Sequence, residues 1–200
     1  MSITCHTPLI LASGSAIRQQ MLKEVGLRFS VLPSGVDEEA LKPTLAHLHV
    51  AQKAIELAKA KALWVSEKNP DALTIGADQI CSLNGTIFDK PGSHEKAELQ
   101  LAALAGHSHT QTNGLIIAKG SKILWEHTAQ ATLTVRPLTP AEIKAYIAAD
   151  APLSSCGAYK LESLGRHLFS NIEGDHDVVK GLALVPLLTE LQRIGAISLV

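Results

Sequence analysis

The pattern of hydrophobic and polar positions predicts strands and helices that alternate in the first half of the chain. Residues 9–12 form a short apolar run between Pro8 and a Ser-Gly turn, which is typical of a buried strand. Apolar residues then recur at helical spacing as far as Val25, and Gly26 follows where a helix would end. The next predicted elements are a strand at 29–32, a helix at 43–67, a buried strand at 73–77 and a hairpin at 80–88 that turns at Asn84-Gly85.

The second half of the chain is predicted to contain more strands that pair with their neighbours. Thr139-Pro140-Ala141-Glu142 has the residue types of a capping box, so a helix is expected from there to about Ala149. The other predicted elements are a helix at 93–104, β-rich stretches at 109–118 and 123–135, a strand at 167–172 and a last helix at 184–194. Alternation early and paired strands later indicate one α/β domain over residues 1–200, with a mixed central β-sheet flanked by helices.

The composition narrows the class of protein and of ligand. Hydrophobic residues make up 46% and charged residues 18% of the 200 residues, which is typical of a globular protein and excludes disorder. The 18 Lys and Arg residues nearly balance the 19 Asp and Glu residues, so no overall field favours a nucleic acid polymer or an anionic membrane. An anionic ligand must therefore be held by a few well-placed cations.

Cysteine usage and the hydrophobic runs predict a cytoplasmic protein. Cys5, Cys81 and Cys156 are odd in number and form no C-x-x-C pair, so we expect reduced thiols. The first residues lack the basic segment of a signal peptide, and no apolar run approaches the roughly 20 residues that span a bilayer.

The turn after the first predicted strand has the residues of a phosphate site. Ser13 and Ser15 place two hydroxyl groups around Gly14 at the start of a helix, and Arg18 follows one turn later. The alternative is that the serines only cap the helix and that Arg18 is a solvated side chain. The segment is not a P-loop, because no G-x-x-x-x-G-K-S/T string occurs.

Two carboxylates are candidates for a metal ligand and a general base. Asp78 follows the buried strand predicted at 73–77, and ligands of α/β sheets bind at the carboxyl ends of strands. A carboxylate held there can bind Mg²⁺ or accept a proton from water. The alternative for Asp78 is a turn residue that caps the next segment. Glu38 lies in a polar loop, where a carboxylate is usually just solvated.

Two lysines could help Arg18 to neutralise a triphosphate. Lys90 follows the predicted hairpin directly and precedes Pro91, which constrains the position of its long side chain. Lys53 shares a predicted helix with Lys59 and Lys61, so by itself it is interpreted as part of a solvated face. Neutralising charge is the main task in phosphoryl transfer.

Histidine spacing suggests a metal site, but the residues around it do not. His47 and His49, like His107 and His109, form H-x-H pairs that no cysteine or third ligand accompanies. We interpret both pairs as surface residues.

A dinucleotide-binding dehydrogenase is also excluded, because no G-x-G-x-x-G follows the first strand.

Taken in order, these segments resemble the Maf family of nucleoside triphosphate pyrophosphatases from about Leu9 to about Gly195. The ordered set is far more specific than any one of its members. The matching segments are Leu11-Ala12-Ser13-Gly14-Ser15-Ala16-Ile17-Arg18, Asp37-Glu38, Lys53-Ala54, Gly76-Ala77-Asp78, Lys90-Pro91, Leu104 to His107 and Cys156-Gly157-Ala158-Tyr159.

The resemblance implies an enzyme with two lobes around a deep cleft, usually a homodimer, that hydrolyses a nucleoside triphosphate to the monophosphate and pyrophosphate with a divalent metal cation, Mg²⁺ or Mn²⁺. It implies that Asp78 accepts the proton of the attacking water and that Glu38 and Asp78 hold the metal. It also implies phosphate contacts, with Lys53 and Lys90 acting as catalytic residues beside Asp78; the residues expected to make these contacts are Ser13, Ser15, Arg18, Lys53 and Lys90. The alternative is a nucleotide-binding regulator of cell division that has no turnover.

Three positions bear on the substrate that the resemblance implies. In the branch of the family that prefers dTTP and UTP, the residues matching Ile17, Gln79 and Glu162 are Arg, Thr and Gln. In the branch that prefers 7-methyl-GTP they are Trp, Gln and Glu, so this chain shares two of three with the second branch. A carboxylate at position 162 suits the N–H donors of a guanine edge. We therefore expect a purine or modified, non-standard purine nucleotide as substrate.

Overall fold

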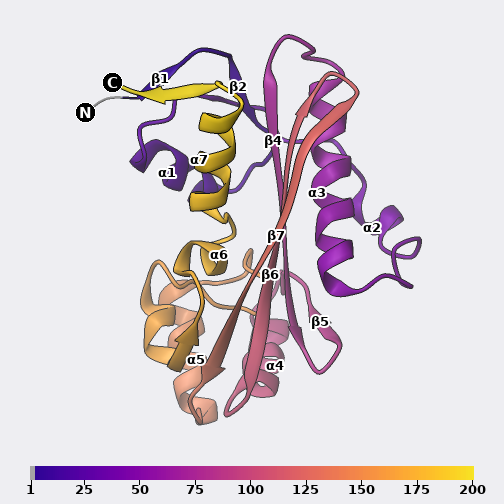
Figure 1. Ribbon diagram of the computed structural model, residues 1–200. Coiled ribbons are helices and arrows are strands. Elements are labelled where there is room, and N and C mark those ends of the chain that lie inside the picture. The colour runs from indigo at the N-terminus through magenta and orange to yellow at the C-terminus, as the bar shows by residue number, and fades with distance from the viewer. Residues whose placement is uncertain (1–2) are drawn as a thin grey trace. The chain divides into compact units, whose positions relative to one another are not determined.

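A computed structural model describes residues 3–200, and the contacts within the chain divide it into two compact units (Figure 1). Unit 1 contains the described residues up to Asp78 together with Asn113–Ala129 and Gly181–Val200. Unit 2 contains Gln79–Thr112 and Gln130–Lys180. The prediction of a single domain over the whole chain, like that of a deep cleft, stays a prediction.

Strands and helices alternate along the chain. The strands are β1 (Ile3–Cys5), β2 (Leu9–Leu11), β3 (Ser30–Val31), β4 (Leu73–Leu83), β5 (Thr86–Phe88), β6 (Ser108–Lys119), β7 (Lys122–Val135), β8 (Phe169–Glu173) and β9 (Ile197–Leu199). The helices are α1 (Ala16–Glu24), α2 (Glu38–Leu41), α3 (Val50–Ser66), α4 (His94–Leu104), α5 (Pro140–Asp150), the 3₁₀ helix η1 (Leu164–Leu168), α6 (His176–Lys180) and α7 (Leu184–Arg193).

The main sheet is mixed, as the sequence predicts. Its strand order is β3-β2-β4-β6-β7-β8, and β5 pairs with β4 as the second strand of a hairpin. The strand β2 runs parallel to β3 and β4, whereas β5 and β8 are antiparallel to their partners. The strands β1 and β9 form a separate antiparallel pair. The predicted α/β class with a mixed central sheet and flanking helices is confirmed.

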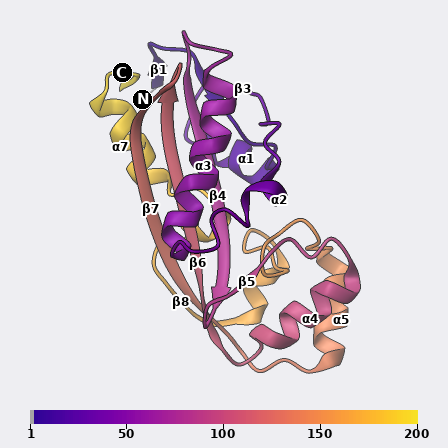
Figure 2. The ribbon, with the colours of Figure 1, turned by 90° about the vertical axis from the view of Figure 1, so that its right-hand side faces the viewer.

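Within unit 1, the helix α3 lies unusually close to the backbone of the sheet (Figure 2). A Cβ atom added to Gly76 in β4 would lie 2.7 Å from the Cβ of Ala62 and would collide with the carbonyl of Ala58. A Cβ added to Gly114 in β6 would lie 2.8 Å from the backbone nitrogen of Ile55. Glycines on the strands and alanines on the helix therefore set the depth at which α3 packs.

Unit 2 has a core of its own on its part of the sheet. Tyr159 and Phe169 meet edge to face with ring centroids 4.8 Å apart, and the ring of His109 lies 5.4 Å from that of Tyr159. The helices α4 and α5 lie side by side in this unit (Figure 2). The capping box predicted for α5 is present, with Thr139 accepting from the Glu142 N–H and Glu142 bonding back to Thr139.

Two predicted element boundaries are wrong by more than two residues. The helix expected at 43–67 begins only at Val50, where Gln52 forms half of a capping box by accepting from the His49 N–H, while residues 42–48 form turns after the short helix α2. The strand expected to end near Ala77 instead continues to Leu83. Apolar spacing alone does not register a capping box or a strand that stays hydrogen-bonded through polar residues.

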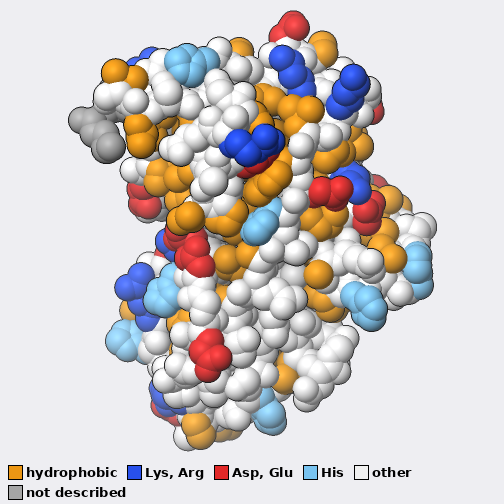
Figure 3. All heavy atoms as spheres, viewed as in Figure 1, with side chains coloured by type: hydrophobic (Ala, Val, Ile, Leu, Met, Phe, Trp, Pro, Cys, Tyr) orange, Lys and Arg blue, Asp and Glu red, His pale blue; other side chains and the backbone are white. Residues whose placement is uncertain are grey.

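None of the helices formed by residues 3–200 has the length and hydrophobicity needed to span a membrane. On the face drawn in Figure 3, Lys and Arg side chains lie interspersed with Asp and Glu side chains. A mixed surface of this kind is what the nearly balanced composition predicts.

Candidate active site

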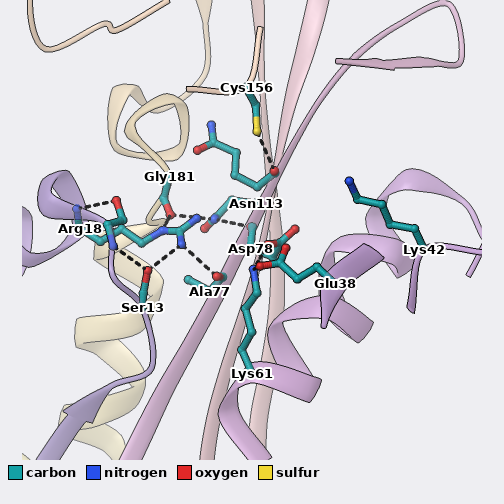
Figure 4. Close-up of polar contacts among 12 residues, drawn as sticks. Ser13, Arg18, Glu38, Lys42, Lys61, Ala77, Asp78, Asn113, Cys156 and Gly181 are labelled. Carbon is teal, nitrogen blue, oxygen red and sulfur yellow. Dashed lines mark hydrogen bonds and ion pairs between the residues drawn. The ribbon is translucent and has the colours of Figure 1, made fainter. Parts of the chain in front are cut away.

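The start of α1 positions the guanidinium group of Arg18 against the backbone of unit 1 (Figure 4). Its Nε donates to the carbonyl of Gly181 at 2.7 Å, and its Nη1 donates to the carbonyl of Ala77 at 3.0 Å and to Oγ of Ser13 at 3.1 Å. Ser13 Oγ also accepts from the Ser15 N–H. These three contacts of the guanidinium group fix the cation in place, so the alternative of a solvated Arg18 is wrong.

Ser15 caps the helix α1, as the alternative to a phosphate site predicts for the two serines. Its side chain accepts from the Arg18 N–H as the N-cap of α1, at 3.5 Å. Ser13 lies just before the helix and is buried, with its hydroxyl group turned to Arg18. The turn thus combines a helix cap with a fixed cation, and both features suit a phosphate group.

The topology of the sheet explains why Arg18 reaches β4. The pairing of β2 with β4 ends at Leu11 and Ile75, and the N–H of Ala12 makes the last bond, to the Ile75 carbonyl. Beyond this point the chain leaves the sheet for the Ser-Gly turn, and Arg18 takes the carbonyl of Ala77 instead. The cation therefore lies at the carboxyl end of β2, where ligands of parallel strands bind.

A buried lysine joins the two candidate carboxylates (Figure 4). Nζ of Lys61 lies 2.5 Å from Oδ1 of Asp78 and 2.9 Å from Oε1 of Glu38. Asp78 and Lys61 are both buried, whereas Glu38 is partly exposed. Both carboxylates that the sequence singles out thus contact Lys61, which sequence reasoning missed because it interpreted this lysine as part of a solvated helix face.

Burial dominates the ionisation of Asp78. Removal from water raises the pKa of its carboxyl group above the usual range, while the charges of Lys61 and Arg18 oppose that shift. A raised pKa brings a carboxylate closer to the range in which it accepts a proton effectively near neutral pH. The carboxylate of Asp78 is thus more basic than that of a surface aspartate, and the charge of Lys61 limits how far its pKa rises.

Asn113 of β6 clamps the backbone on which Asp78 is carried. Its Nδ2 donates to the carbonyls of Asp78 and Gly181 at 2.9 and 3.0 Å, and its Oδ1 accepts from the N–H of Ala183 at 2.9 Å. The side chain is fully buried. Sequence reasoning missed Asn113, because it follows a run of polar residues in the first half of β6 and nothing local distinguishes it from them.

Asp78 does not end its strand as predicted. It lies inside β4, which runs on through Gln79 to Leu83. The alternative of a turn aspartate is wrong for the same reason. The carboxylate is instead a buried side chain in mid-strand, which needs a partner such as Lys61.

Lys53 and Lys90 belong to different units. Lys53 is half-buried in the first turns of α3, about two turns before Lys61. Lys90 is exposed and belongs to unit 2, in the segment between β5 and α4. Their phosphate contacts stay predictions. Lys61 was detectable in the sequence, because it falls on the buried stripe of α3 formed by Ala54, Leu57, Ala58, Ala62 and Val65.

The predicted substrate-recognition residues differ in their surroundings. Gln79 is half-buried and its amide nitrogen is hydrogen-bonded within unit 2. Glu162 is exposed in the segment before η1, and Ile17 is half-buried in the first turn of α1. Their roles in recognising a nucleobase stay predictions.

One histidine departs from the interpretation as a surface residue. His109 is buried, and its Nε2 lies 2.7 Å from the hydroxyl oxygen of Tyr159. His47, His49 and His107 are exposed, as expected. His109 alternates inward on β6, and the strand period, rather than the H-x-H spacing, decides its position.

The carboxylates define how a divalent cation could be held. No group of three or more His, Cys, Asp or Glu side chains that could bind a metal occurs within residues 3–200. Two carboxylates are nonetheless enough for Mg²⁺, which commonly combines one or two of them with water and substrate phosphates. Glu38 and Asp78 each have a second carboxylate oxygen besides the one that faces Lys61, so this donor set fits a cation shared with a polyphosphate.

The Maf-like protein family model matches residues 8–194. The chain belongs to the Maf-like family. Among curated Maf-like relatives, a nucleoside triphosphate pyrophosphatase of Legionella pneumophila (strain Philadelphia 1) is 41% identical over 192 residues and a second from Rhodopseudomonas palustris (strain BisB18) is 41% identical over 188 residues. The first alignment covers 96% of both chains and the second 93% of both.

A further relative carries a more specific name. A 7-methyl-GTP pyrophosphatase of Mesorhizobium japonicum is 42% identical over 194 residues, which cover 95% of this chain and 98% of that one. Among solved structures, a HAM1 protein from Coxiella burnetii aligns with 64% of this chain and 73% of its own at 11% identity and a TM-score of 0.37. That structural likeness is too slight to bear on the Maf-like fold.

Proposed function

We propose that the chain hydrolyses a nucleoside triphosphate to the nucleoside monophosphate and pyrophosphate. The observation that carries the proposal is the buried Asp78–Lys61 pair, which Glu38 joins in the same unit as the fixed guanidinium of Arg18. The names of the Legionella, Rhodopseudomonas and Mesorhizobium relatives support the same reaction.

In this reaction the residues of unit 1 divide between charge and proton transfer. Arg18 and the N–H groups at the start of α1 stabilise negative charge on the phosphates. Asp78 accepts the proton of a water molecule that attacks the bridge between the α and β phosphates, and burial has raised its pKa for that purpose. Lys61 orients Asp78 and keeps it charged between turnovers.

A divalent cation, Mg²⁺ or Mn²⁺, belongs to the same proposal. Glu38 and Asp78 would hold it together with substrate oxygens, and it would neutralise phosphate charge there. The proposal further includes a cytoplasmic location and a homodimer, which the cysteine usage and the family resemblance respectively support.

The substrate that we propose is a purine or modified purine nucleotide. Gln79 and Glu162 support it at two of the three positions that differ between branches of the family. The 42% identity to the 7-methyl-GTP pyrophosphatase supports it as well, although relatives with the general name are as similar.

A nucleotide-binding regulator without turnover is the competing function. A pure binder has no need for a general base, and the buried Asp78, paired with Lys61, has the raised pKa that suits one. The pair therefore favours the enzyme.

The test is product analysis with the purified chain, Mg²⁺ or Mn²⁺, and a panel of standard, methylated and damaged nucleoside triphosphates. We expect pyrophosphate and the monophosphate as first products from at least one of them, and H₂¹⁸O labelling will locate the attacked phosphorus. Orthophosphate and a diphosphate as first products would contradict the cleavage position. Tight binding with no product across the panel would support the regulator.

A further inference from the structure

A chain of four polar side chains runs through unit 2 from Gln79 to His109. Gln79 Nε2 lies 2.9 Å from Oε1 of Gln111, and Gln111 Nε2 lies 2.6 Å from the hydroxyl oxygen of Tyr159. The same oxygen lies 2.7 Å from Nε2 of His109. Gln111, Tyr159 and His109 are buried, while Gln79 is half-buried at one end.

Backbone carbonyls fix the direction of every hydrogen bond in this chain. Gln79 Nε2 also contacts the carbonyl oxygens of Val179 and Val178, at 2.8 and 3.2 Å. A carbonyl can only accept, so the atom that meets these two oxygens must be the amide nitrogen of Gln79. The atom of Gln111 that faces this nitrogen must then be its oxygen, and Gln111 donates to Tyr159 through its own nitrogen.

The last two members follow from the first two. Tyr159 accepts from Gln111 and has one hydrogen of its own, which it donates to Nε2 of His109. His109 is thus neutral and carries its proton on Nδ1, for which no partner is found within residues 3–200. Burial lowers the pKa of His109 to about 4, so the ring stays neutral at neutral pH.

These directions determine which atom Gln79, the half-buried first member of the hydrogen-bonded series, leaves for a ligand. With its nitrogen held by three acceptors, Gln79 turns its Oε1 away from them, and no hydrogen bond to Oε1 is found within residues 3–200. The side chain therefore offers an acceptor and no donor.

We propose that Gln111 is a positioning residue for the nucleobase: it holds the amide of Gln79 so that Gln79 meets an N–H group of the base as a hydrogen-bond acceptor. This inference rests on the proposed function, because it assigns Gln79 to the nucleoside end of the same substrate. Tyr159 supports Gln111 from behind and does not touch the ligand.

The test compares binding of a nucleotide with binding of a ligand that has no base. The probes are the α,β-methylene analogues of the four standard nucleoside triphosphates, which resist cleavage between the α and β phosphates, and inorganic tripolyphosphate. Calorimetry gives the Kd of the tightest analogue for the native chain, Gln111→Leu, Gln79→Ala and the double variant. Gln130→Leu is the matched control, because Gln130 also donates a hydrogen bond, to Thr112, but lies outside the chain of contacts.

We expect Gln111→Leu to weaken binding of the analogue by about threefold to tenfold, the equivalent of one hydrogen bond, with tripolyphosphate binding unchanged. In the Gln79→Ala background the same substitution should have no further effect, because Gln111 acts through Gln79. Gln130→Leu should bind both probes like the native chain. Additive losses, or equal losses for tripolyphosphate, would overturn the inference.

Tyr159→Phe is the second variant, for the case that Gln111→Leu does not fold. It removes the hydroxyl group that holds Gln111 but keeps the ring that packs on Phe169. It should also weaken binding of the analogue more than binding of tripolyphosphate, and equal effects would overturn the inference. If the protein binds an analogue but releases no pyrophosphate from the natural nucleotide, the proposed enzyme is rejected, while the comparison of variants still tests the role of Gln111. If the protein binds none of the four analogues, the proposed function and the role of Gln111 are both overturned.

Discussion

Nζ of Lys61 lies 2.5 Å from Oδ1 of Asp78, and both side chains are buried within unit 1. Lys61 of α3 and Asp78 of β4 thereby form a buried ion pair. Neither residue would keep its charge there without the other. A lone charge in such a place would be neutralised by a shift of its pKa. Catalysis should therefore depend on both members of the pair.

Replacing Asp78 by Asn should remove the proton acceptor while keeping the size of the side chain. We expect the rate of pyrophosphate release to fall by about 10² to 10⁴, the usual contribution of a general base. The matched control is Asp71→Asn, an exposed aspartate that precedes β4. A coupled pyrophosphate assay measures both. If Asp78→Asn kept the native rate, the role given to Asp78 would be wrong.

Replacing Lys61 by Met should impair catalysis far more than the same change at a neighbouring lysine. The substitution leaves the buried carboxyl group of Asp78 without its nearest cation, so we expect a loss of about 10²-fold or more in kcat. Lys59→Met is the control, because Lys59 pairs on the surface with Glu56 and Glu126. Lys53→Met tests the role predicted from the sequence, and a loss as large as that of Lys61→Met would show that Lys53 contributes equally.

Replacing Gly76 by Ala should destabilise the protein, because the added Cβ would lie 2.7 Å from the Cβ of Ala62 and against the carbonyl of Ala58. We expect the free energy of unfolding to fall by about 1–3 kcal/mol, as in overpacked cores. Gly14→Ala is the control, because its added Cβ would meet Pro33 at an ordinary 3.7 Å. Urea denaturation measures both, and equal midpoints would contradict the close approach of α3.

The stability of the protein should fall as the pH is lowered through the range set by His109. Burial holds its pKa near 4 in the folded state, against an ordinary value of 6.5. Because the folded pKa is the lower one, the contribution of this group is fully present above pH 6.5 and is lost as the pH falls from about 6.5 to about 4. The loss amounts to roughly 3 kcal/mol at the acid end.

Two variants test this assignment by urea denaturation over that range. His109→Asn should flatten the decline in unfolding free energy between pH 6.5 and pH 4, because the titrating ring is gone. His94→Asn, at an exposed position at the start of α4, should leave the slope unchanged. A native slope in His109→Asn would mean that another group causes the decline.

The order of elements could be predicted from the sequence because their signals are local. The apolar run at residues 9–12, the capping box at Thr139 and the turn at Asn84-Gly85 each depend on residues a few positions apart. The Ser13-Gly14-Ser15 turn with Arg18 was recognisable for the same reason, and so were the separate candidates Glu38 and Asp78.

Local sequence patterns do not predict which residues from distant parts of the sequence contact one another. Lys61 was assigned to a solvated face because helical lysines usually are, and only the packing of α3 on Gly76 and Gly114 brings that face down onto Asp78. The apolar run at residues 73–77 predicts that the strand ends before Asp78, and only the pairing with Lys61 lets β4 continue through this buried charge.

The sequence by itself thus determined the elements, the mixed α/β class and most of the charged residues of the site, since these follow from spacing and residue type. Tertiary structure alone decided the Asp78–Lys61 pair, the clamp of Asn113 and the direction of the Gln79 amide. Each of these joins residues at least 17 positions apart in the chain, and the free energy of a buried charge or amide depends on the partner that folding places beside it.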